Sequence, residues 1–268
     1  MHKIFSLTLV AFLVGCGGSG GGTNETPSKG STPTKKESGD KTKPLKANND
    51  GKIKTITLAT GSAEDIAVSK DTLYVAKGKD GVDVVNIGYN DSLSSELITA
   101  ISGVNAKSVT VSEDGKQLYI VNEQGFVNIY DISNVSKPKK GRTTTQQEVK
   151  KEAKTNDGKY KFIPKDKDGL EIYNIKEQSV EAYFNKSSAY DVVLADHDSK
   201  ALIAAGVTGI NLIDITKPTE PNMVVNFAIK GGTKGLSLNK EQGILFVANG
   251  DKGVLVYSLN VLLDKLSK

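Results

Sequence analysis

The stretch AYDVVLADHDSKALIAAGVTGINLIDITKPTEP, Ala189–Pro221, decides the fold of this chain. It contains three short runs rich in Val, Ile and Leu, at Tyr190–Ala195, Ala201–Ala205 and Gly209–Ile215. Turn residues bound each run, which is typical of β-strands. The stretch ends in TKPTEP, and its prolines cannot continue a central strand. It therefore predicts three consecutive strands of one sheet.

Five copies of this pattern follow one another along the chain. A glycine opens the third run of each copy, and successive glycines are 44, 44, 40 and 44 residues apart, at Gly81, Gly125, Gly169, Gly209 and Gly253. A fourth apolar run follows the third in two copies, at Glu96–Ile101 and Met223–Ile229. A period of about 40–45 residues with several short strands is typical of β-propeller blades.

The fifth copy lacks a fourth run, because Asn260–Lys268 has the pattern of a short helix. A candidate for the missing strand precedes the first copy, where Lys52–Ala59 alternates in strand fashion. If this strand pairs with the fifth copy, it closes the ring and removes two exposed sheet edges. We therefore predict an all-β fold, a five-bladed β-propeller closed by its N-terminal strand, over residues 52–268.

Residues 1–51 lie outside the repeats. Lys3 precedes an apolar run, Ile4–Val14, which is too short to span a bilayer and is typical of a signal peptide. The run ends in LVGC, which resembles a bacterial lipobox, and Cys16 is the only cysteine in the chain. We expect a lipoprotein signal peptide over 1–15 and, over 16–51, a disordered Gly/Ser/Lys/Pro linker anchored through lipidated Cys16. The alternative is a general secretory signal with an incidental cysteine.

The residue after the cysteine suggests where in the cell the protein is located, and the charge balance suggests which class of partner it binds. Gly17 follows Cys16, and the resemblance to Gram-negative lipoproteins then implies the outer membrane of the cell envelope, on its periplasmic or surface face. Residues 53–268 hold 27 basic and 27 acidic residues, a balance that argues against a nucleic-acid partner. The expected partners are the membrane and an unidentified envelope protein or polysaccharide.

The third copy departs most from the repeat. Its inner strand reads VKKEAKT over Val149–Thr155, and Lys137–Asp168 holds eleven basic and five acidic residues. One interpretation is a decayed blade whose inner strand is partly solvated. The other is a basic patch that binds an anionic polysaccharide or lipid headgroups, formed by Lys139, Lys140, Arg142, Lys150, Lys151 and Lys154.

Candidates for catalysis are few. Asp65 and Asp191 begin equivalent inner strands and could face each other across the ring as a hydrolytic carboxylate pair. The alternative is that each accepts hydrogen bonds from backbone in the neighbouring blade. His197 is the only histidine of the mature chain and lies in a turn, so we expect neither a metal site nor a cofactor. Asp-Gly pairs such as Asp80–Gly81 fit hairpin turns better than calcium loops.

The repeat resembles the LVIVD repeat family through AYDVV, GINLIDI and the closing PTEP, and LYIVNEQGFVNIYDI is similar to the related YVTN-type repeat. The resemblance implies a β-propeller on an exported protein and implies no shared reaction. We therefore expect a non-catalytic interaction module in the cell envelope. The alternative is a carbohydrate-active hydrolase that uses Asp65 and Asp191.

Overall fold

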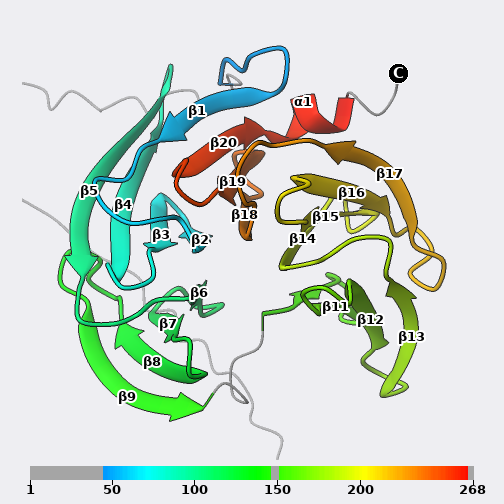
Figure 1. The fold of residues 1–268 in the computed structure, drawn as a ribbon, viewed down its shortest axis with the longest axis horizontal. Coiled ribbons are helices and arrows are strands. Elements are labelled where there is room, and N and C mark those ends of the chain that lie inside the picture. Colours follow the sequence, from blue (N-terminus) through cyan, green and yellow to red (C-terminus); the bar gives the residue numbers. More distant parts are fainter. Residues whose placement is uncertain (1–44, 146–150, 265–268) are drawn as a thin grey trace, which may run out of the picture. The chain divides into compact units, whose positions relative to one another are not determined.

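The computed structural model describes residues 45–145 and 151–264, which form a ring of five four-stranded antiparallel sheets around a central axis (Figure 1). The predicted all-β, five-bladed propeller is confirmed. In each blade the first strand is innermost and the chain steps outward by hairpins. The first blade contains β2 (Asp65–Ser69), β3 (Thr72–Ala76), β4 (Val82–Tyr89) and β5 (Leu93–Ile101).

The next three blades repeat this order, and their strands are as follows. The second blade contains β6 (Ser108–Val111), β7 (Gln117–Val121), β8 (Phe126–Asp131) and β9 (Lys139–Thr145). The third contains β10 (Ala153–Lys154), β11 (Tyr160–Pro164), β12 (Leu170–Asn174) and β13 (Ser179–Phe184). The fourth contains β14 (Asp191–Ala195), β15 (Lys200–Ala204), β16 (Ile210–Asp214) and β17 (Asn222–Phe227).

The fifth blade joins the two ends of the propeller. It takes its three inner strands from the end of the chain, β18 (Gly235–Asn239), β19 (Ile244–Ala248) and β20 (Val254–Ser258). Its outermost strand is β1 (Lys52–Ile56), which pairs antiparallel with β20 and sets Ile56 opposite Val254. The predicted closure is therefore present, with a strand three residues shorter than expected. The short helix α1 (Leu259–Asp264) follows β20.

The glycine that opens the third strand of each copy has a steric role. Gly81 has a φ of +78° and Gly209 one of +96°, values that favour glycine. A Cβ on Gly81 would lie 2.0 Å from the carbonyl oxygen of Ile101, and one on Gly209 would lie 2.1 Å from that of Phe227. The outermost strand thus passes too close to this glycine for any side chain, which explains why the repeat retains it.

Apolar clusters fill the space between neighbouring blades, except at one junction. The clusters between the other neighbours hold eleven to thirteen buried residues each. On the side of the second blade that faces the third, the cluster contains only Val121, Val127 and Ile129. The third blade offers polar atoms there, since Lys161 pairs with Glu152 at 3.4 Å. This junction is the least apolar in the described ring.

The described part of the chain begins before the first strand. Leu45 packs against the apolar cluster between the fifth and first blades, within the segment that the sequence assigns to the linker. The proposed signal peptide, Cys16 and residues 17–44 lie outside the described residues. In the described ranges, no helix has the length and apolar character needed to cross a membrane.

Candidate functional site

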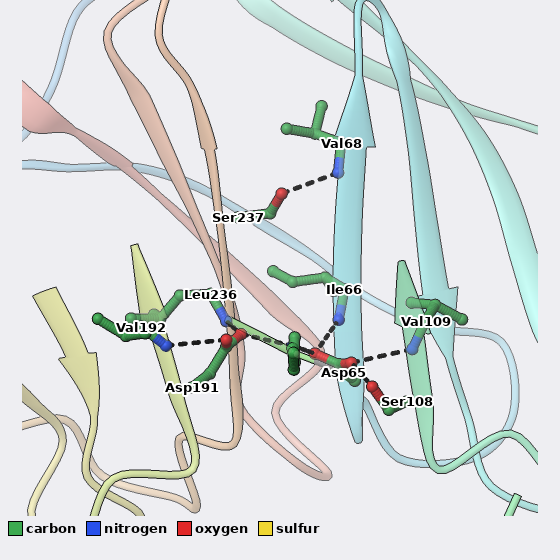
Figure 2. A network of polar contacts seen from close by, with 10 residues as sticks. Asp65, Ile66, Val68, Ser108, Val109, Asp191, Val192, Leu236 and Ser237 are labelled. Atoms are coloured by element: carbon green, nitrogen blue, oxygen red, sulfur yellow. Dashed lines mark hydrogen bonds and ion pairs between the residues drawn. The ribbon is translucent and has the colours of Figure 1, made fainter. Parts of the chain in front are cut away.

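Asp65 and Asp191 lie at the centre of the ring, at the start of innermost strands β2 and β14. They are 3% and 2% exposed. Asp65 accepts N–H groups from Ile66 at 2.8 Å and, across the blade junction, from Val109 at 2.9 Å (Figure 2).

Asp191 repeats this arrangement in the fourth blade. It accepts the N–H of Val192 at 2.8 Å and, from the fifth blade, the N–H of Leu236 at 2.7 Å (Figure 2). Both carboxylates thus make the neighbouring-blade bonds that the structural alternative requires. A hydrolytic pair would need carboxylates free of backbone hydrogen bonds, so this geometry does not favour the hydrolase.

Lys151 lies between these two aspartates. Its ammonium group donates to Oδ1 of Asp65 and to Oδ2 of Asp191, and 27% of its side chain is exposed. Lys151 thereby links the third blade to the first and fourth blades across the axis. The sequence suggests a solvent-facing patch residue, but the structure places Lys151 against two buried carboxylates.

The cluster shifts the ionisation of its members. Burial lowers the pKa of Lys151, but Asp191 and Asp65 outweigh it and leave the pKa above its ordinary value. Burial raises the pKa of Asp191 to about 6, Lys151 acts against that rise, and Asp65 adds to it. Two buried carboxylates therefore share one ammonium group, whose side chain is 27% exposed.

A cavity of about 590 Å³ opens above this cluster, where the innermost strands begin, and all five blades contribute to its wall. Its charged lining residues are Glu64, Asp65, Lys107, Lys151, Asp166, Lys186 and Lys234. A smaller cavity of about 210 Å³ lies further along the inner strands, and Lys151 lines both. Lys151, Asp65 and Asp191 therefore separate two cavities along the axis of the ring.

The other predicted basic residues do not gather around Lys151. Lys139, Lys140 and Arg142 lie exposed on β9, the outermost strand of the second blade. Lysines on an edge strand disfavour pairing with another chain, which is a sufficient structural reason for their presence. Lys154 lies on β10, where it pairs with Glu152 at 3.2 Å. Lys150 falls outside the described residues.

His197 and the Asp-Gly turns can be placed directly. His197 is exposed in the turn between β14 and β15, with a φ of +52°. The Lys77 N–H donates to the carbonyl of Gly81 at 2.8 Å, which closes the turn containing Asp80. Over 45–145 and 151–264, no group of three or more His, Cys, Asp or Glu side chains is arranged to hold a metal ion.

Sequence reasoning missed the cavity wall. Four of its residues share one repeat position, immediately before an innermost strand: Glu64, Lys107, Tyr190 and Lys234. The four residues lie at the same end of their innermost strands. Alignment of the repeats could therefore have predicted that they lie near one another. The side chains differ from copy to copy, so no residue motif marks the position.

Comparisons with known proteins identify the repeat and the fold. The LVIVD repeat matches residues 60–99 and 103–145. No curated protein matches the chain. Among solved structures, a chain of the "Crystal Structure of Mitotic Checkpoint Complex" matches with a TM-score of 0.57 and 12% identity, over 81% of this chain and 97% of that chain. Identity this low shows a shared fold only. The chain is thus a five-bladed β-propeller in which residues 60–99 and 103–145, within the first two blades, match the LVIVD repeat.

Proposed function

We propose that this protein is a lipid-anchored propeller of the cell envelope, acting as a non-catalytic interaction module for a protein or polymer partner. The observation that carries the proposal is the cavity of about 590 Å³, to which every blade contributes. Its volume falls within the range of ligand sites, about 300–1,000 Å³. The carboxylates beneath it, Asp65 and Asp191, already bind backbone and Lys151.

The anchoring part of the proposal rests on the sequence. An apolar run over Ile4–Val14 ends at the only cysteine, Cys16, and a polar, Gly-rich segment follows. Several acyl chains on one cysteine would hold the protein stably at a membrane, because each buried methylene contributes about 0.8 kcal/mol. We expect wild-type protein in the outer-membrane fraction and Cys16→Ser in the soluble fraction. Cys16→Ser protein that stays with the membrane contradicts the anchoring.

The binding part is tested by affinity capture from intact envelopes, with the full chain as bait. We expect one retained protein or polymer. A bait carrying Lys107→Glu, Lys186→Glu and Lys234→Glu at the cavity should lose it, whereas a bait carrying three lysine-to-glutamate changes on the opposite face should keep it. Capture of nothing by the wild-type bait contradicts the interaction function. Turnover of envelope glycans that is lost in Asp65→Asn and Asp191→Asn would instead support the hydrolase.

A further inference from the structure

The unpaired charged groups of the large cavity indicate what kind of ligand it accepts. Two of its four lysines are already in ion pairs: Lys151 pairs with Asp65 and Asp191, and Lys234 pairs with Glu64. Lys107, Lys186 and one carboxylate, Asp166, line the cavity without an ion pair to any described residue, so lysines outnumber carboxylates among the unpaired groups. Free ammonium groups at a concave site favour an anionic ligand.

These two lysines come from different parts of the ring. Lys107 immediately precedes β6 of the second blade, and Lys186 lies in the link between β13 and β14. They therefore flank the third blade at the cavity mouth. Ser187, Ser188 and Thr208 also line this wall. The hydroxyls of Ser187 and Thr208 already donate to the carbonyls of Ser188 and Ala205, at 3.1 and 2.9 Å. A carboxylate that enters there therefore meets two ammonium groups and the hydroxyl donor of Ser188.

One side of the cavity is apolar. Tyr190 packs over Gly206 so closely that a Cβ on Gly206 would lie 2.8 Å from the Tyr190 ring. Beside it, Val207 is 84% exposed at the tip of the turn between β15 and β16. An exposed apolar side chain at a cavity rim offers a contact to an apolar group of a ligand. The wall holds a single aromatic residue, Tyr190, which gives little surface for stacking sugars.

We infer that this cavity binds a short acidic peptide segment of a partner protein. Its carboxylates bind Lys107 and Lys186, and a neighbouring apolar side chain packs against Tyr190 and Val207. The inference rests on the proposed interaction function and narrows the partner to a protein with an exposed acidic and apolar segment. Among anionic ligands, the apolar side selects the peptide over an acidic glycan.

The test is fluorescence anisotropy with the full chain in mild detergent and labelled peptides of alternating Glu and Leu. We expect binding that weakens with added salt, because the lysines are solvent-exposed and screened. A peptide of alternating Gln and Leu should bind at least tenfold more weakly. The double variant Lys107→Gln/Lys186→Gln should lose about tenfold in affinity for the acidic peptide, as two exposed ion pairs are removed.

A matched control removes the same charge elsewhere. Lys176 and Lys217 are 84% and 75% exposed and lie in turns between third and fourth strands, on the face opposite the cavity. The variant Lys176→Gln/Lys217→Gln should bind the acidic peptide as wild type does. Val207→Ser should weaken binding of the Glu/Leu peptide and leave a Glu/Ser peptide unchanged, which separates the apolar contact from the charge.

Several outcomes would overturn the inference. They are equal binding of the acidic and neutral peptides, equal losses in the cavity and control variants, and binding of an oligogalacturonate without binding of any peptide. The outcomes also separate the two proposals. A partner captured from envelopes that Lys107→Gln/Lys186→Gln still retains would refute this site and leave the interaction function standing. Absence of any captured partner would refute the function itself.

Discussion

Replacement of Lys151 with methionine tests whether one cation holds the centre of the ring together. Methionine keeps much of the side-chain length and removes the charge. Asp65 and Asp191 would keep their backbone donors, but their side chains are only 4% and 3% exposed and would face each other without a counter-ion. Breaking a buried ion pair by removing one partner costs about 3–5 kcal/mol.

We expect a loss at the lower end, about 3 kcal/mol at pH 7, because backbone N–H groups still stabilise each carboxylate. For a domain of this size, that loss corresponds to about 6–12 °C in Tm. Urea unfolding followed by circular dichroism measures it. The control is Lys154→Met, whose side chain is 54% exposed and whose pair with Glu152 should contribute less than about 1 kcal/mol.

The dependence on pH distinguishes lost charge from lost packing. Protonation of one carboxylate relieves the repulsion, so the deficit of Lys151→Met should shrink between pH 7 and pH 4. In the wild type, burial raises the pKa of Asp191 to about 6, so the folded state holds this proton more tightly than the unfolded state. The contribution of Asp191 to stability is therefore greatest below pH 4 and is lost as pH rises through about 6. A deficit of equal size at both pH values, or no deficit at pH 7, refutes the reasoning.

Three further predictions concern the ring itself. Gly81→Ala should destabilise by more than 2 kcal/mol, because strain at positive φ adds to a clash with a backbone carbonyl, whereas Gly103→Ala has open space around it and should cost only about 1 kcal/mol in the same urea assay. Asp83→Ala should cost about 3–5 kcal/mol by thermal unfolding, since it leaves Lys77, which is 6% exposed, without its partner at 2.8 Å. Deletion of Lys52–Ile56 should abolish the single cooperative transition, because β20 becomes an open edge; a ring that merely frays, with unchanged midpoint, contradicts the closure.

How well the sequence predicts a strand depends on whether the residues of that strand are buried. Strands whose residues pack on both faces carry an apolar signal, and the predicted run Tyr190–Ala195 matches β14, Asp191–Ala195, to within one residue. Strand β9, KKGRTTT, has no buried residue, so its pairing with β8 left no pattern that could reveal it. In the described residues the inner strand of the third blade spans only Ala153–Lys154, and Lys151 just before it makes ion pairs with Asp65 and Asp191.

The role of Lys151 could not be predicted, because a lysine in a polar run is ordinarily solvated. Its partners lie 86 and 40 positions away in the chain, and only closure of the ring brings them together. The repeat did make the two aspartates equivalent, since both start inner strands. It could not indicate that the same cation, from the copy with the weakest resemblance, would lie between them.

Some positions of the repeat hold the ring together and another lines the cavity, and this difference indicates where function can vary between copies. Residues that recur between copies, such as Asp65, Asp191 and the glycine before each third strand, bond or pack against neighbouring blades and strands. The residue just before the inner strand makes its common contact through backbone, from its N–H to the carbonyl that ends the second strand. Its side chain lines the cavity as Glu64, Lys107, Tyr190 or Lys234. Side chains there can change without loss of the ring, so selection for a ligand can act on them independently of stability. A ring of identical residues at this position could recognise only a symmetric ligand, whereas different charges at the same repeat position allow an asymmetric ligand to be recognised. For this reason we place recognition at the cavity mouth.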